Sequence, residues 1–171
     1  MASGEEARTI HSPLTLVQTP SQTVGPFFSI GLFREPQHVL TGGAAAGERI
    51  RIEGLVLDGA GAPVPDAMIE VWHPSIGHGR AGTNPHGEFH FETAKPPYLD
   101  VIVFARGMLV HAFTRMYFSD EARNAADAVL QSVEPARRST LIGVRDDLDG
   151  RPLYRWDIRL QGDGETVFFD L

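Results

Sequence analysis

Histidines are the first residues of this chain that could do chemistry, because imidazole is a common metal ligand. Four of the seven histidines fall in one stretch: His73, His78, His86 and His90. Their spacing does not form a metal motif, since Pro85 and Gly87 exclude the helix that would place His86 and His90 on one face. We expect solvated histidines here, and a histidine-dependent metal hydrolase is the weaker interpretation.

Arg106 is the second candidate. It follows the apolar segment VIVFA (101–105) and precedes Gly107, so its guanidinium is expected at the end of a buried strand. Arginine can bind a carboxylate through two parallel hydrogen bonds. It can equally form a structural ion pair with one of the acidic residues of the chain. The sequence alone leaves both interpretations open.

The segment TPSQTVGPFF (19–28) is the third candidate. Pro20 and Pro26 fix the backbone and push the residue before each of them toward an extended conformation. Gly25 permits a sharp bend and a close approach by another surface. We predict a stiff, bent arm that packs on its own domain or, alternatively, packs on another chain or lines a pocket.

Composition describes the protein in which these residues are set. The 171 residues suit one domain, and 18 glycines with 12 prolines favour many turns and an all-β architecture. A net charge of −7 argues against a nucleic-acid surface. The absence of cysteine, of a secretory h-region in MASGEEARTI and of a membrane-length apolar run predicts a cytoplasmic protein.

Alternating apolar residues predict most of the strands that would position the candidates. In the clearest case, Ile50, Ile52 and Val56 share one face while Arg51 and Glu53 share the other. The continuously apolar run VIVFA is typical of a strand buried on both faces. The predicted strands cover residues 49–58, 67–72, 88–93, 101–105, 109–118, 153–160 and 165–171.

One helical insertion interrupts these strands. Ser119 is a good N-cap, and an alanine-rich run continues to about Val133. Glu134-Pro135 either ends the helix or begins a second short turn. The predicted fold is an all-β sandwich with one helical insertion and an extended N-terminal arm. We divide the chain into a flexible leader (1–15), an arm and loop (16–47) and the sandwich domain (48–171).

Six segments in the same order resemble one family. TPSQTVGPFF, EVW, VFARG, TRMYFSDEA, YRWDIRLQG and GETVFFD together resemble the intradiol ring-cleaving dioxygenases, over Thr19 to Leu171. The resemblance is to the alpha subunit of the two-subunit members. It implies a β-sandwich and the cleavage of protocatechuate by dioxygen to 3-carboxy-cis,cis-muconate, in the beta-ketoadipate pathway.

The resemblance also implies where the metal is. In the family, two tyrosines and two histidines, including a His-x-His pair, hold a non-haem Fe3+. This chain has no His-x-His pair and carries roughly Tyr98-Leu99-Asp100 at that place. Tyr98 could instead align with one of the tyrosine ligands, and the loop from Pro74 to Arg80 holds no tyrosine. We expect no metal in this chain and the ferric ion in the partner beta subunit.

The site residues implied by the resemblance belong to a pocket wall. They are Thr23, Gly25 and Pro26 from TVGPFF and Arg106 from VFARG, at a cleft that this chain forms with the beta subunit. A higher oligomer of alpha–beta protomers and a small aromatic acid substrate are implied with them. The alternative is a stand-alone transthyretin-like β-sandwich binding module, which would need no partner.

Overall fold

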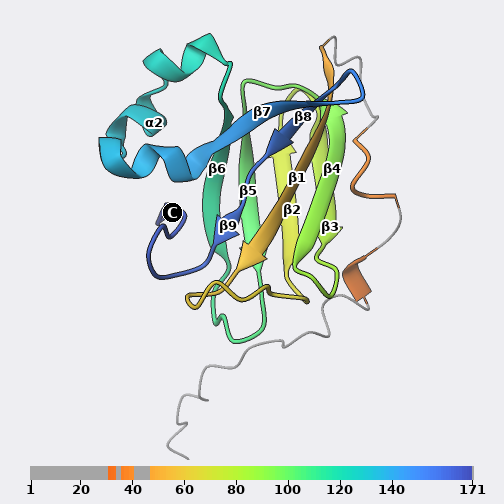
Figure 1. Cartoon of the computed structure of the whole chain (residues 1–171), viewed down its shortest axis with the longest axis vertical. Coiled ribbons are helices and arrows are strands. Elements are labelled where there is room, and N and C mark those ends of the chain that lie inside the picture. The colour runs from red at the N-terminus through yellow and green to blue at the C-terminus, as the bar shows by residue number, and fades with distance from the viewer. Residues whose placement is uncertain (1–30, 34–35, 41–46, 171) are drawn as a thin grey trace, which may run out of the picture.

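The computed structural model describes residues 31–33, 36–40 and 47–170 (Figure 1). The predicted arm residues Thr23, Gly25 and Pro26 lie outside the described residues, as do the expected leader and most of the segment 16–47. The predicted start of the sandwich domain at residue 48 is followed at once by the first strand, which begins at Arg49.

The described part of the chain contains nine strands. They are β1 (Arg49–Leu57), β2 (Met68–His73), β3 (Gly77–Gly82), β4 (Glu88–Ala94), β5 (Tyr98–Phe104), β6 (Ala112–Phe118), β7 (Ile142–Leu148), β8 (Arg151–Arg155) and β9 (Ile158–Arg159).

The strands form two layers that face each other. One layer runs in the order β3-β2-β5-β6, and the other in the order β7-β8-β1-β4, with β9 beside the end of β1. Strand β7 joins the layers, because its first residues pair in parallel with β6 and its later residues pair antiparallel with β8. Figure 1 shows β1, β4 and β8 in front of β2, β3 and β5. The predicted all-β sandwich is confirmed.

The core lies between the layers and follows the alternation of the sequence. Ile50, Ile52 and Val56 of β1 are buried, as predicted, and they pack in one cluster with apolar residues of β2, β4 and β5. The prediction that VIVFA is buried on both faces is wrong. Val101 and Val103 are fully buried, whereas Ile102 and Phe104 on the other face are only partly covered. Strand β5 therefore has an inner face and an outer face.

The helical insertion is three short segments instead of one helix. They are η2 (Ala122–Ala126) and η3 (Pro135–Leu141), both 3₁₀, and α2 (Ala128–Ser132). New helical segments begin after Glu121 and Asp127, because the carboxylate of each residue caps the segment that follows it. These carboxylates accept hydrogen bonds from the N–H groups of Arg123 and Leu130, respectively. The predicted N-cap, Ser119, instead accepts a hydrogen bond from the Arg145 N–H at 2.9 Å.

Several predicted strands differ from the observed ones in their limits. The run 109–118 enters the sheet only at Ala112, because Leu109 and Val110 lie in an exposed turn. The run 153–160 is divided between β8 and β9 by Trp156-Asp157. The described residues of the run 165–171 contribute a single bridge, between Phe169 and Phe113. Strands β3 and β7 were not predicted from the sequence.

A membrane-spanning helix is not found in the described part of the chain, since none of its helices is long and apolar enough to cross a bilayer.

Candidate functional site

The outer face of the β2-β5-β6 sheet carries the positions to which the sequence directed attention. Side chains alternate along a strand, and the residues of β5 that face away from the core are partly exposed. We call this surface the outer face. Its members include Trp72, Tyr98, Asp100, Ile102, Phe104 and Arg115.

Tyr98 and Asp100 share one partner on the outer face. The guanidinium carbon of Arg115 lies 4.3 Å from the centre of the Tyr98 ring, and Arg115 Nε donates a hydrogen bond of 2.7 Å to Asp100 Oδ1. His73 meets the Tyr98 ring edge to face, with 5.0 Å between ring centres. Desolvation lowers the pKa of His73, which favours the neutral imidazole beside this cation.

These contacts decide whether the face suits a ferric ion. Phenolate and imidazole are the ligands that the family implies, yet Tyr98 is covered by a guanidinium and Asp100 already neutralises that cation. The next outward position is Ile102, which has no donor atom. Among the described residues, no group of three histidine, aspartate or glutamate side chains could hold a metal ion. The residues present on the outer face do not fit the ion.

The four clustered histidines are separated in the structure. His73 lies at the end of β2, His78 is 3.6 Å from Glu70 between the atoms Nε2 and Oε1, and His86 belongs to the β3–β4 turn. His90 lies on β4 in the other layer, in edge contact with His38. Desolvation lowers the pKa of His90. Residues close in sequence therefore serve different surfaces.

Arg106 occupies a tight turn at one end of the outer face. The Met108 N–H donates to the Ala105 carbonyl at 3.3 Å, and Gly107 has φ of +84°, a conformation that favours glycine. The Arg106 Nε lies 2.6 Å from Oδ2 of Asp66. The Arg106 side chain is 59% exposed and that of Asp66 only 13%. The structural ion pair considered from the sequence is present, and most of the guanidinium still faces outward.

Sequence reasoning did not single out Asp66, although a signal for it exists. Strands β2 and β5 are antiparallel, with Met68 opposite Phe104. Extending that pairing by two residues places Asp66 opposite Arg106. The two apolar segments could have been aligned in this way from the sequence, once their pairing was assumed.

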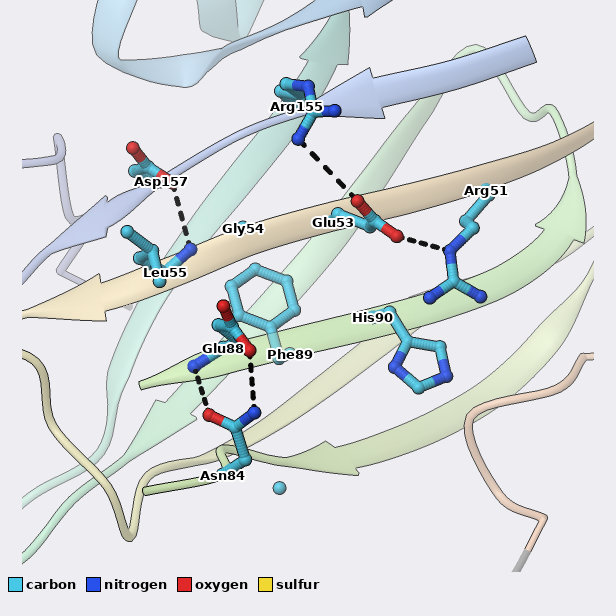
Figure 2. Close-up of a pocket in the computed structure, with 11 residues that line it drawn as sticks. Arg51, Glu53, Gly54, Leu55, Asn84, Glu88, Phe89, His90, Arg155 and Asp157 are labelled. Atoms are coloured by element: carbon cyan, nitrogen blue, oxygen red, sulfur yellow. Dashed lines mark hydrogen bonds and ion pairs between the residues drawn. The ribbon is translucent and has the colours of Figure 1, made fainter. Parts of the chain in front are cut away.

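A groove lies on the opposite surface of the sandwich. It is a groove of about 670 Å³ across β1 and β4 (Figure 2), lined by Arg51, Glu53, Gly54, Leu55, Gly82, Asn84, Glu88, Phe89, His90, Arg155 and Asp157. Figure 2 shows Glu53 between two arginines, with its oxygens 2.5 Å from Arg51 Nε and 3.7 Å from Arg155 Nη1. Glu53 thus pairs with an arginine on each side within the groove.

A cluster of charged residues around Asp120 joins the two layers near the helical segments. The carboxylate of Asp120 accepts hydrogen bonds from Lys95 at 2.8 Å, Arg145 at 2.8 Å and the Tyr154 hydroxyl at 2.9 Å. Burial would raise the pKa of Asp120, but these three donors outweigh it and hold the pKa well below its usual range. The cluster is a structural clamp, because its donors are directed at one acceptor.

Comparisons with known proteins identify relatives of this chain. The chain is 42% identical, in an alignment 195 positions long, to the protocatechuate 3,4-dioxygenase alpha chain of Burkholderia cepacia, covering 92% of this chain and 99% of that one. The chain belongs to the protocatechuate 3,4-dioxygenase alpha-chain family. This family is one of intradiol ring-cleaving dioxygenases that have more than one kind of subunit. No general family model matches the chain.

Two further comparisons extend the family assignment. The protocatechuate 3,4-dioxygenase beta chain of Burkholderia cepacia is 28% identical over 76% of this chain and 72% of its own length. Alpha-chain and beta-chain sequences are thus related. The dioxygenase domain of a dioxygenase–carbohydrate-binding fusion from Streptomyces sp. SirexAA-E has a TM-score of 0.59 at 21% identity, covering 84% of this chain and 98% of that domain. That likeness supports the fold.

Membership of the alpha-chain family also bears on the alternatives raised by the sequence. It favours a subunit of a heteromeric enzyme over a stand-alone transthyretin-like binding module. A metal hydrolase is disfavoured by a separate observation, because the histidines on which that interpretation depended are dispersed over both layers.

Proposed function

We propose that this chain is the subunit without iron of a two-subunit protocatechuate 3,4-dioxygenase, and that a beta subunit holds the ferric ion. The observation that carries this proposal is the outer face. Tyr98 and Asp100, which lie roughly where the resemblance implies the His-x-His pair, are held by Arg115. The related beta-chain sequence supports a partner of similar fold.

Arg106 is the residue through which we propose that this chain assists the reaction. Protocatechuate is a carboxylate, and a guanidinium at the mouth of the cleft would attract and orient it. Within the described part of the chain, Arg106 contacts a single acid, Asp66, through Nε. Its terminal nitrogens therefore remain available for a second carboxylate.

The arm residues Thr23, Gly25 and Pro26 complete the proposed wall. A proline-fixed bend with a glycine at its turn supplies shape without rotatable polar groups. Its proposed role is to close the cleft and exclude water from the reacting ring. A ferric ion held by the partner subunit would activate the ring of protocatechuate, whereas this chain would bind, orient and shield that substrate.

Location and assembly form part of the same proposal. The cysteine-free composition suits a reducing compartment and supports a cytoplasmic enzyme. We further propose that alpha–beta protomers assemble into a higher oligomer that serves the catabolism of protocatechuate through the beta-ketoadipate pathway.

The test uses the complex of this chain with its beta subunit. Replacing Arg106 by Gln removes the charge, and we expect KM for protocatechuate to rise about tenfold, the value of one charge-assisted hydrogen bond. The apparent affinity for catechol, which lacks the carboxylate, should not change. Arg123→Gln is the matched control, because Arg123 is 72% exposed and also contacts an acid, Glu121, through Nε.

The result that would overturn the role of Arg106 is an unchanged KM for protocatechuate in the Arg106→Gln complex. The assignment of iron to the partner has a separate test. Metal analysis of the two subunits after separation should find iron with the beta subunit, and iron retained by this chain would contradict the proposal.

A further inference from the structure

Asp66 and Arg106 are brought together by the register of the sheet. Met68 of β2 lies opposite Phe104 of β5 in the last antiparallel pair, and extending this register by two residues beyond the strands places residue 66 opposite residue 106. Opposed residues of one parity project on the same side of a sheet. The contact of 2.6 Å between Asp66 Oδ2 and Arg106 Nε agrees with this extended register.

The backbone around Asp66 is held rigidly from both sides. The hydroxyl of Thr83 donates to the Val64 carbonyl at 2.7 Å and accepts from the Ala67 N–H at 2.9 Å. One side chain thus fixes the residues on either side of the Pro65-Asp66 turn. Pro65 restricts the backbone further. Asp66 is therefore a fixed reference point for a longer and more mobile partner.

The charges of the pair are unequally covered. Both carboxylate oxygens of Asp66 are buried and make no hydrogen bond with aligned geometry within the described residues. A carboxylate in that position needs a neighbouring cation, and Arg106 supplies it through Nε. Arginine loses considerable rotamer freedom when it is held in one direction. The ion pair thus limits where the exposed end of Arg106 can lie.

We propose that Asp66 is a positioning residue that holds Arg106 by its Nε edge, so that the terminal guanidinium nitrogens face the carboxylate of the aromatic acid substrate. The inference rests on the proposed function of Arg106 and adds the group that orients it. Asp66 itself does not touch the substrate.

Positioning and simple electrostatics predict opposite results when Asp66 is neutralised. Asp66→Asn removes a negative charge close to Arg106 and so raises the local positive potential. If Asp66 mattered only as a charge, the anionic substrate would bind more tightly. If Asp66 positions Arg106, the guanidinium becomes free to rotate and the substrate binds less tightly.

The experiment is a double-mutant cycle in the complex with the beta subunit. We expect Asp66→Asn to raise KM for protocatechuate roughly three- to tenfold, with kcat and the apparent affinity for catechol unchanged. In the Arg106→Gln background, Asp66→Asn should have no further effect. Glu121→Gln is the matched control, because it frees Arg123 in the same way at the opposite end of β6. The midpoint of thermal unfolding confirms that each variant is folded.

Each outcome separates this inference from the proposed function. A lowered or unchanged KM in Asp66→Asn, together with a raised KM in Arg106→Gln, overturns the positioning role and leaves the function of Arg106 intact. An Asp66→Asn effect that persists without Arg106 shows a purely structural role and also overturns the inference. An unchanged KM in Arg106→Gln removes the proposed function and the inference with it.

Discussion

Arg115 lies over the ring of Tyr98, with its guanidinium carbon 4.3 Å from the ring centre, while its Nε binds Asp100. The tyrosine is thus the platform of a cation–π contact and the aspartate is its counter-ion. Three residues of the outer face satisfy one another in this way. Tyr98 therefore has a structural role that needs its ring and does not need its hydroxyl.

Replacing Tyr98 by Phe tests that role. We expect the complex with the beta subunit to keep its iron content and its visible absorption, because a phenyl ring preserves the contact with Arg115. Iron content by elemental analysis and the absorption spectrum are the measurements. A loss of iron or a shifted visible band in this variant would identify Tyr98 as a metal ligand.

Sequence patterns predicted the parts of the fold in which apolar residues alternate. Strands β1 and β4 were predicted because apolar residues occupy every second position in them, for example Ile52 in β1 and Phe91 in β4. Strand β3, GHGRAG, has almost no apolar side chain and was not found. It forms because β2 offers a paired edge and because its glycines leave room for Leu40 and Phe33. Such a strand is specified by its neighbours.

The candidate site was predictable only in part for the same reason. Arg106 was singled out because it ends an apolar run, and its environment proved to be an exposed turn. Asp66 was not, because it lies 40 positions earlier in the chain and only the pairing of β2 with β5 brings it close. The histidine cluster was adjacent in sequence but is divided between the two layers. Sheet pairing, which is a long-range property, brings Asp66 close to Arg106 and keeps the histidines apart.

Gly54 of β1 marks the place where β8 and β9 are interrupted. A β-carbon at this position would overlap the carbonyl oxygen of Trp156 and come within 3.0 Å of the Phe89 ring. The crossing is fixed by the hydrogen bonds Trp156 N–H to Glu53 carbonyl and Leu55 N–H to Asp157 Oδ1, each 2.9 Å. We therefore expect Gly54→Ala to lower the free energy of unfolding by about 3 kcal/mol or more.

Urea unfolding of the two glycine variants provides the comparison for that prediction. Gly47→Ala is the control, because a β-carbon there meets its nearest neighbour at an ordinary 3.5 Å. We expect this variant to differ from the parent by less than roughly 0.5 kcal/mol. Equal stability of the Gly54 and Gly47 variants would show that the crossing can open without cost.

Asp120 makes stability depend on acidic pH. Burial opposes its ionisation, but the hydrogen bonds from Lys95, Arg145 and Tyr154 prevail and lower its pKa in the folded state. A lowered pKa contributes stability above the unfolded value of about 3.9, and this contribution is lost as pH falls below it. We therefore expect the urea midpoint of the Asp120→Asn variant to change less between pH 5 and pH 3 than that of the parent. These two pH values lie on either side of roughly that unfolded pKa.

The size of the Asp120 effect is limited by solvent. The side chain is 34% exposed, so we expect a loss of about 1 kcal/mol at pH 7 instead of the larger value for a fully buried pair. Asp146→Asn is the control, because Asp146 is 56% exposed and contacts Arg155 at 3.3 Å. If both variants lose the same stability at pH 7, the clamp is no stronger than an ordinary surface pair.

Tyr117 makes stability depend on alkaline pH. Burial raises its pKa above the ordinary value near 10, with a smaller contribution from the hydrogen bond of 2.9 Å that its hydroxyl donates to Asp127, and the opposing interaction with Arg115 does not cancel this rise. A raised pKa contributes stability that is complete below about pH 10 and is lost as pH rises above it. Tyr117→Phe should therefore cost about 1 kcal/mol at pH 7, from the lost hydrogen bond, and lose less stability than the parent between about pH 10 and pH 11.5.

Burial also raises the pKa of Tyr154, so the stability of the Tyr117→Phe/Tyr154→Phe variant should depend on alkaline pH still less. Chemical unfolding at each pH measures the slopes, and a Tyr117→Phe slope as steep as that of the parent would show that the phenol ionises without opening the packing around Leu130 and Leu141.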